Sequence, residues 1–240
     1  DAPANAGDAA GPSEDVAYSS WTAATDWGYT DVDSDTMVSI TLKSLPSQGT
    51  LTEASSACGG TCEVDDVITL ANLGNLIYTG ASNYNGADTF TYTVQDAALS
   101  SSTGTMTLTV AAVNDAPVNT LGSASAVNED TANAITGSSI ADAEDSSMTS
   151  VVITADRGTF TLTTSSATYD VGTQGTAAST VTISGTVTNI NVAIATITWT
   201  SAADDSTNAV ITVVTTDSSG GADTDTISIT VNAVNDTPAN

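Results

Sequence analysis

The stretch that decides the fold is Met106-Thr-Leu-Thr-Val-Ala-Ala-Val-Asn-Asp-Ala-Pro117, because it recurs later as Ile227-Ser-Ile-Thr-Val-Asn-Ala-Val-Asn-Asp-Thr-Pro238. Each copy begins with apolar and polar residues in alternation, which is the pattern of a strand with one face in a core. Each copy ends in Asn-Asp followed by a proline, which indicates a linker. The chain also opens on Asp1-Ala-Pro3, the tail of the same phrase, so we expect two tandem repeats cut from a longer protein.

Further matches keep the same order along both repeats, so chance similarity explains them poorly. Gly49-Thr-Leu-Thr, for example, matches Gly158-Thr-Phe-Thr in the second repeat. The predicted boundaries are residues 1–113 for repeat 1, with residues 1–5 as the tail of a preceding linker, residues 114–234 for repeat 2, and residues 235–240 for the start of the next linker.

The remainder of both repeats has a β pattern. Thr and Val favour strands and alternate through stretches such as residues 89–94 and 180–183, while Asp, Asn and Gly favour the turns between them. Short strands at this density predict a Greek-key sandwich of the immunoglobulin type. The predicted fold class is all-β, with two tandem sandwiches in an elongated rod. The pattern allows a short helical turn near residues 189–195 but no long helix.

Apolar residues at alternate strand positions form the predicted core. Tyr78 and Trp199 occupy matching positions and are expected to be core aromatics. Trp21 and Trp27 lie in a less regular stretch, so burial and an exposed contact role both remain open for them. The other predicted core residues are Ile77, Phe90, Tyr92, Leu108, Val110, Ile197, Val213, Ile229 and Val231.

Composition excludes several classes of function. The 240 residues include 28 Asp plus Glu, two Lys plus Arg and no His, which gives a formal net charge of -26. Such a chain has no surface that neutralises phosphates, so we expect no nucleic acid partner and no docking on anionic membranes. No apolar stretch is long enough for direct membrane insertion. Histidine-based catalysis is excluded, and no nucleophile or phosphate-loop motif appears, so we expect no enzyme.

Two cysteines lie close together in Cys58-Gly-Gly-Thr-Cys62. A zinc site needs about four ligands, and the sequence offers no further cysteine or histidine. We expect a local disulfide, with two free thiols or a redox pair as the alternatives. A disulfide in an acidic, strand-rich chain fits an extracellular location.

The acidic residues recur in register rather than at random. Each repeat has acids just after its linker, in an early turn, at the end of a strand and in the Asn-Asp pair of the junction. In this order they are Glu14, Asp15, Asp31, Asp33, Asp35, Asp96, Asn114 and Asp115 for repeat 1, and Glu129, Asp130, Asp142, Glu144, Asp145, Asp217, Asn235 and Asp236 for repeat 2. Uncompensated carboxylates repel one another, and hard divalent cations are their natural counter-ions.

The layout resembles the bacterial cadherin-like, or tandem immunoglobulin-like, repeats of giant secreted adhesins and surface proteins. The similarity covers essentially the whole chain. The segments that support it are Val113-Asn-Asp-Ala-Pro117, Val127-Asn-Glu-Asp-Thr131 and Asn83-Tyr-Asn-Gly-Ala-Asp-Thr-Phe-Thr-Tyr-Thr-Val94. By this resemblance, Ca2+ is the expected cofactor and lies between successive repeats.

The resemblance also implies which residues bind the ions. The junction between the repeats would take Glu14, Asp88, Asn114, Asp115, Asp142, Glu144 and Asp217. The junction before Asp1 would take Asp31, Asp33 and Asp96, and the junction after repeat 2 would take Glu129 and Asp236.

This chain departs from the cadherin junction in ways that affect the number of ions. Ala112 and Ala116 stand where that junction carries further Asp and Asn ligands, so one or two ions per junction are expected. The run from Asp31 to Asp35 resembles an EF-hand loop, but Thr36 and Leu42 replace its Gly and Glu, which excludes that loop. The alternative to ion binding is that these acids are solvated turn residues.

The functional hypothesis is a calcium-stiffened structural pair from a long extracellular adhesin, filament or surface protein. Its expected partners are the neighbouring repeats of the same array and identical chains packed laterally. The alternative is a carbohydrate- or ice-binding sandwich, because sandwich domains often bind glycans and rows of Thr can order water. The threonines here alternate with core residues, as on ordinary outer faces, which favours the first hypothesis.

Overall fold

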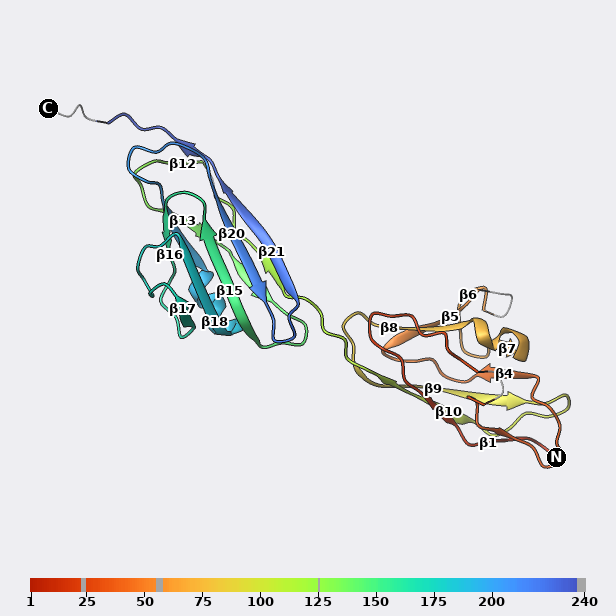
Figure 1. Ribbon diagram of the computed structural model, residues 1–240. Helices are drawn as coiled ribbons and strands as arrows, with labels where there is room; N and C mark the ends of the chain where they lie inside the picture. Colours follow the sequence, from red (N-terminus) through yellow and green to blue (C-terminus); the bar gives the residue numbers. More distant parts are fainter. Residues whose placement is uncertain (23–24, 55–57, 125, 237–240) are drawn as a thin grey trace. The chain divides into compact units, whose positions relative to one another are not determined.

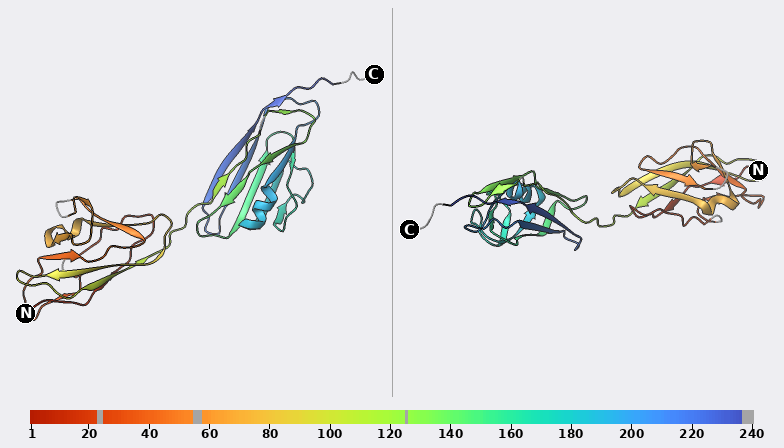
Figure 2. Two further views of the ribbon diagram at one scale, coloured as in Figure 1. Left: turned by 180° about the vertical axis from the view of Figure 1, so that it is seen from behind. Right: turned by 90° about the horizontal axis from the view of Figure 1, so that it is seen from above.

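The computed structural model describes residues 1–22, 25–54, 58–124 and 126–236, so residues 237–240 of the predicted last linker lie outside it. The chain divides into two compact units, unit 1 at Asp1–Val113 and unit 2 at Asn114–Asn240 (Figure 1). In each, the chain enters at one end and leaves at the opposite end, so each unit has an N-terminal pole and a C-terminal pole (Figure 2).

Unit 1 is a β-sandwich with one short 3₁₀ helix. A five-stranded sheet has the order β2-β10-β9-β4-β7, a three-stranded sheet has the order β6-β5-β8, and β1 pairs with β3. The elements are β1 (Ala4–Asn5), β2 (Asp8–Ala10), β3 (Tyr29–Thr30), β4 (Ser39–Leu42), β5 (Gly49–Glu53), β6 (Gly60–Thr61), β7 (Val67–Thr69), η1 (Leu70–Asn75), β8 (Leu76–Gly80), β9 (Gly86–Gln95) and β10 (Gly104–Val110).

Unit 2 has the same two-layer plan with one α-helix. Its five-stranded sheet has the order β17-β18-β15-β20-β21 and its three-stranded sheet the order β13-β19-β16, while β11 pairs with β14. The elements are β11 (Val118–Thr120), β12 (Val127–Asn128), β13 (Asn133–Thr136), β14 (Ser139–Ala141), β15 (Ser147–Ala155), β16 (Thr159–Thr161), β17 (Thr168–Val171), β18 (Thr180–Thr186), α1 (Val187–Ile194), β19 (Thr196–Thr200), β20 (Ala209–Thr216), β21 (Ala222–Ile229) and β22 (Val231–Asn232).

An early strand pairs in parallel with the last strand in both units. In unit 1, β2 pairs with β10, and an isolated parallel bridge joins Ser13 to Ala111. In unit 2, β12 pairs with β22, with Asn128 opposite Asn232. This pairing places the acid that follows the early strand beside the end of the last strand. The C-terminal pole of each unit is therefore built from both ends of its sequence.

The core of unit 1 is aromatic. Phe90 and Tyr92 are fully buried on β9, and Trp21 and Trp27 are only 5% and 1% exposed. The Trp27 ring packs edge-on against Tyr92 with 5.1 Å between ring centroids, and Trp21 lies 5.5 Å from Trp27. The exposed contact role considered for these two tryptophans is therefore wrong. They lie in an irregular segment, but they fill the space between the two sheets.

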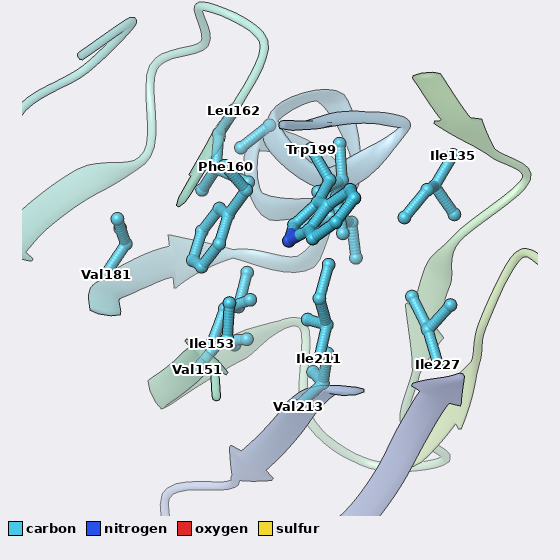
Figure 3. Close-up of a cluster of buried hydrophobic side chains, with 14 of the residues drawn as sticks. Ile135, Val151, Ile153, Phe160, Leu162, Val181, Trp199, Ile211, Val213 and Ile227 are labelled. Carbon is cyan, nitrogen blue, oxygen red and sulfur yellow. The ribbon is translucent and has the colours of Figure 1, made fainter. Parts of the chain in front are cut away.

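The core of unit 2 follows the strand alternation. In β20, residues alternate between buried and half-buried along the whole strand, with Ile211 and Val213 inside. Figure 3 shows the Trp199 ring between Phe160 and Ile135, with Ile211 beneath it. Trp199 is 1% exposed, and its indole N–H donates to the Arg157 carbonyl oxygen at 3.0 Å. The prediction that Trp199 is a core aromatic is confirmed.

The predicted core is confirmed except at one position. Tyr78 is fully buried, as are Leu108 and Ile197, but Ile77 is half-buried. In β8 the inward residues are Leu76 and Tyr78, so Ile77 points to the other side. The apolar run across these three residues has no alternation of its own, and the pairing with β5 decides which residues face the core.

The short helix and the disulfide are both as expected. Helix α1 begins where the Thr186 side chain accepts a hydrogen bond from the Asn189 N–H, which satisfies one of the free donors of the first turn. Cys58 and Cys62 form a disulfide. It closes the loop beside the β5–β6 hairpin at the edge of the three-stranded sheet.

Two glycines lie against the core aromatics at matching positions. A Cβ atom on Gly49 would lie 2.5 Å from the Tyr78 ring atom Cε2. A Cβ on Gly158 would lie 3.0 Å from Cε2 of Trp199 and would overlap the Thr200 carbonyl oxygen. These close approaches explain why the Gly-Thr-apolar-Thr motif occurs in both repeats.

We predict that Gly158→Ala destabilises unit 2 by at least about 3 kcal/mol, because it adds overlap with Thr200 to the cost of a left-handed backbone. Gly175 is the matched control, because its φ of +68° equals that of Gly158 within 1° and nothing lies near its Cβ position. Gly175→Ala should cost only about 1 kcal/mol. Urea unfolding of both variants measures the difference, and equal losses would contradict the packing argument.

Candidate metal centres

The N-terminal pole of unit 2 is a loop held by one oxygen of Asp142. Asp142 Oδ1 accepts hydrogen bonds from the Glu144 N–H at 3.0 Å and the Asp145 N–H at 2.6 Å, which fixes the turn after β14. The second oxygen, Oδ2, is buried and has no hydrogen-bond partner. Asp145 in turn accepts hydrogen bonds from the backbone N–H and the hydroxyl of Ser218, so this loop is tied to the loop after β20.

Asp217 joins the same pole from the end of β20. Its side chain is 2% exposed, and Oδ1 accepts hydrogen bonds from the N–H groups of Ser219, Gly220 and Gly221 at 2.6–2.8 Å. Oδ2 accepts from the Asn114 amide at 2.8 Å. This bond from Asn114, followed by those from the backbone, holds the pKa of Asp217 below its usual value although burial opposes the shift. Asp217 is therefore a pre-formed anion.

The linker residues dock on this pole of unit 2. Asn114 donates to Asp217, and the backbone N–H of Asp115 donates to Glu144 Oε2 at 3.0 Å. Unit 2 therefore brings Asn114, Asp115, Asp142, Glu144 and Asp217 together, as the sequence predicted for this half of the junction.

The N-terminal pole of unit 1 repeats these contacts with different residues. Asp31 Oδ1 accepts from the N–H groups of Asp33 at 2.9 Å and Asp35 at 3.0 Å, while Asp31 Oδ2 is buried without a partner. The amino group of Asp1 donates to Asp33 Oδ2 at 2.7 Å, just as Asp115 donates to Glu144 in unit 2.

Asp96 corresponds to Asp217 and lies at the end of β9. It is 1% exposed, and Oδ1 accepts from the N–H groups of Ala98 and Leu99, both at 2.6 Å. The bonds from Leu99 and Ala98 lower the pKa of Asp96, so it too is charged. Its Oδ2 is buried and has no hydrogen-bond partner.

A buried glutamate marks the C-terminal pole of each unit. Glu14 is fully buried, and its Oε1 accepts from the Val113 N–H at 2.6 Å. Glu129 is 4% exposed, and its Oε1 accepts from the Val234 N–H at 2.8 Å. The other oxygen differs between the units. Glu14 Oε2 lies 3.5 Å from the Asn85 amide, whereas Glu129 Oε2 is buried without a partner.

Both oxygens of Asp88, which the resemblance names as an ion ligand, accept hydrogen bonds from within unit 1. Its side chain is 3% exposed, and Oδ1 accepts from the backbone N–H groups of Ser47 and Thr89, both at 2.9 Å. Oδ2 accepts from the Gln48 N–H at 3.1 Å and the Tyr78 hydroxyl at 3.0 Å. Both oxygens are used by donors of unit 1. Asp88 therefore fixes the loop before β5 and does not have the free oxygen that a metal ligand offers.

Sequence comparison did not assign Asp130 and Asp204 to the ion site. In unit 2 the Asp204 N–H donates to Asp130 Oδ1 at 3.1 Å, and carboxylate oxygens of Asp130, Asp204 and Asp236 all lie within 4.8 Å of one another. Partial desolvation, and then the charges of Asp204, Asp130 and Glu129, raise the pKa of Asp236. Asp204 lies in the loop between β19 and β20, where repeat 1 has no acid, so the in-register search could not find it.

The arrangement of these oxygens fits a hard divalent cation. Buried carboxylate oxygens without donors are costly unless something compensates them. The two basic side chains are already paired with other acids, Lys43 with Asp65 and Arg157 with Asp205. Calcium takes six to eight oxygen ligands from carboxylates, amides, carbonyls and water, which is the donor set present at the poles. The unpartnered oxygens at the poles are those of Asp31, Asp96, Asp142 and Glu129.

Residues 1–109, nearly all of unit 1, match the family model described as a bacterial Ig domain. Unit 1 is therefore similar to bacterial Ig domains. Unit 2 has the same pairing of early and last strands and the same pole contacts as unit 1, so the chain is a tandem of two similar sandwiches. The resemblance to bacterial cadherin-like or immunoglobulin-like repeats is confirmed. Ig- and cadherin-like domains are generally not enzymes, and bacterial Ig domains are typically found on extracellular proteins.

Solved structures with a similar fold include cadherins. Protocadherin Gamma B2 domains 3–6 match with a TM-score of 0.46 and 12% identity over 98% of this chain and 48% of that one. Human CDH23 EC21–23 matches with a TM-score of 0.43 and 13% identity over 98% of this chain and 70% of that one. An endo-fucoidan hydrolase of glycoside hydrolase family 107 matches with a TM-score of 0.32 and 18% identity, over 97% of this chain and 29% of that one.

The chain spans less than half the length of the fucoidan hydrolase and of the Protocadherin Gamma B2 structure. No curated protein matches it. Within the described residues, no helix is long and apolar enough to cross a bilayer.

We predict that Asp88→Asn destabilises unit 1 by about 2–3 kcal/mol, because an amide group would face donors that now meet a carboxylate. The stabilisation that calcium gives should stay the same as in the unsubstituted chain. Thermal unfolding with and without calcium measures both quantities. Asp65→Asn is the control in the same unit, because its exposed pair with Lys43 is worth less than about 1 kcal/mol. A stable variant with a weakened calcium response would restore Asp88 as a ligand.

Proposed function

We propose that the chain is a structural repeat pair of a long extracellular adhesin, filament or surface protein, and that calcium stiffens it at the poles of its units. The proposal rests on one observation: at matching positions of the two repeats, the two oxygens of a carboxylate have different surroundings. Asp31 and Asp142 each use one oxygen to hold their own loop and keep the other buried without a donor. A solvated turn residue has no reason to bury a charged oxygen in this way in both repeats.

Charge supports the same function. With a net charge of -26, the chain repels itself, and the acids at the poles add to that repulsion. Lys43 pairs with Asp65 and Arg157 pairs with Asp205, so both basic side chains are already paired with acids. Bound divalent ions would remove the repulsion and supply the missing partners of the buried oxygens.

The linker is the segment on which ion binding would act. The Val113 N–H is tied to Glu14 within unit 1, and the amide of the next residue, Asn114, is tied to Asp217 within unit 2. These anchors are on consecutive residues. Calcium bound within either unit would therefore restrict the linker residue that this unit holds. Ions that bind the ordered linker better than the free one stabilise the ordered form by mass action.

The proposed partners are the neighbouring repeats of the same array, and the expected setting is extracellular. Extracellular modules bind calcium with dissociation constants of about 10⁻⁴–10⁻³ M, which suits fluids rich in calcium. The Cys58–Cys62 disulfide agrees with an oxidising environment. The role follows from mechanics: a chain of sandwiches spans distance only if its linkers resist bending.

We predict that calcium raises the melting temperature and that EGTA reverses the rise. At a concentration a hundred times the dissociation constant, one site adds about 2.7 kcal/mol, which shifts the melting temperature by several degrees. Asp142→Asn combined with Glu144→Gln should reduce the shift, because the amides keep the acceptor oxygens of the loop but lose both charges. Asp170→Asn with Asp225→Asn makes the same charge change elsewhere in unit 2. Equal shifts in the two double variants would count against pole binding.

Stiffening requires its own measurement, since an ion can stabilise a unit without ordering the linker. Small-angle scattering of the full chain should give a narrower distribution of interdomain distances with calcium than with EGTA. The Asp142→Asn/Glu144→Gln chain should respond less to calcium than the control double variant. A distribution that calcium leaves unchanged would make the linker a plain tether and overturn the stiffening role.

A further inference from the structure

The C-terminal pole of unit 2 holds the densest group of carboxylates among the described residues. One oxygen each from Asp130, Asp204 and Asp236 lies within 4.8 Å of the other two. Two ligands of one calcium ion, each about 2.4 Å from it, are at most about 4.8 Å apart. The three oxygens therefore already satisfy the spacing that a shared ion requires.

A buried, unpartnered oxygen lies at the same pole. Glu129 is 4% exposed, and its Oε2 has no hydrogen-bond partner. Its other oxygen is held by the N–H of Val234, two residues before Asp236. An exposed acidic cluster alone would be ordinary, but here a buried carboxylate of the same pole keeps one oxygen without a hydrogen-bond partner, and a cation would supply that partner.

The backbone fixes two of these residues in advance. Asp130 and Asp204 have φ values of 57° and 55°, in the left-handed region, and the Asp204 N–H donates to Asp130 Oδ1. The Asp130 N–H donates to the Ser201 hydroxyl at 2.9 Å, which ties the pair to the end of β19. The two loops therefore present their carboxylates together before any ion arrives.

Unit 1 has the same backbone with a different side chain. Asp15 and Asn83 have φ values of 57° and 55°, and the Asn83 N–H donates to Asp15 Oδ1 at 3.2 Å. Asn83 thus stands where unit 2 has Asp204. Its side-chain oxygen accepts a hydrogen bond from the Ser82 hydroxyl at 2.6 Å, and the Asn85 amide faces Glu14. A neutral amide therefore occupies the place that the Asp204 carboxylate occupies in unit 2.

We propose that the C-terminal pole of unit 2 contains a divalent-cation site complete within that unit, formed by Asp130, Asp204, Asp236 and Glu129, and that this site fills at lower calcium than the pole of unit 1. The inference rests on the proposed function and adds the order in which the poles bind calcium. More carboxylates in a pre-formed set give tighter calcium binding. The single exchange of Asp204 for Asn83 therefore separates the affinities of the two poles.

The test is a calcium titration of the full chain in competition with a chromophoric chelator. The unsubstituted chain should bind one ion tightly and the others more weakly. Asp204→Asn should weaken the tight step by at least about tenfold, because one charged ligand is lost. The variant should still fold, since asparagine tolerates the left-handed backbone and keeps the N–H that donates to Asp130. Circular dichroism checks that it does.

Two further variants make the test specific. Asn83→Asp gives unit 1 the residue of unit 2 and should strengthen one of the weak steps by a similar factor. Asp170→Asn removes one exposed charge from β17 and should leave the tight step within about twofold, as expected for a distant charge screened by salt. A tight step that Asp204→Asn leaves unchanged, or that Asp170→Asn weakens equally, would overturn the inference.

The outcome is separable from that of the proposed function. Failure of Asp204→Asn to change the tight step, in a chain that calcium still stiffens, rejects the complete site and keeps the stiffened pair. If Asp204→Asn abolishes the tight step but calcium does not change the scattering of the unsubstituted chain, the site is supported and stiffening is rejected. A chain that binds no calcium in the titration rejects both.

Discussion

The structure depends on carboxylates whose two oxygens do different work. At the N-terminal poles, one oxygen of Asp31 or Asp142 accepts the N–H groups of its own turn, and the other is buried without a donor. Asp96 divides its oxygens in the same way. The first oxygen makes the loop rigid, and this rigidity keeps the second oxygen out of solvent. A cation would supply the partner that the second oxygen lacks, so loop folding and ion binding are coupled.

The sandwich supplies the frame for this arrangement. Every second residue of the strands packs into the core of its unit. The packed strands position Asp96 and Asp217, which follow the ends of β9 and β20. The parallel pairing of an early strand with the last one places Glu14 beside Val113 and Glu129 beside Val234. The acids are thus concentrated at the poles by the topology itself. Core and poles are separate in composition, which lets the poles vary between repeats while the fold stays the same.

Much of this was predictable from sequence because the repeat supplies an internal comparison. The positions of Asp31 and Asp142, and of Tyr78 and Trp199, follow from matching one repeat to the other. The prediction that Ile77 lies in the core is wrong, because the residues around it are all apolar and show no alternation. Only the pairing of β8 with β5 decides which of them face the core. Burial of the tryptophans in the irregular segment depends on contacts with Tyr92 and Phe90, far away in sequence.

The site could be predicted only in part for the same physical reason. Asp88 looked like a pole ligand, but the N–H groups of Ser47 and Gln48 come from a distant loop that sequence does not place beside it. Asp204 cannot be predicted from acids that recur in both repeats, because its counterpart in repeat 1 is Asn83. Positions at which the two repeats differ, such as Asp204 and Asn83, therefore indicate where their ion sites differ.

The most direct test of the central claim is anomalous diffraction from crystals of the full chain grown with calcium, measured at long wavelength. We expect calcium peaks within about 2.6 Å of the buried, unpartnered oxygens of Asp96, Asp142 and Glu129. This expectation would be contradicted by a map in which these oxygens, at saturating calcium, contact only ordered water and no anomalous peak lies at any pole.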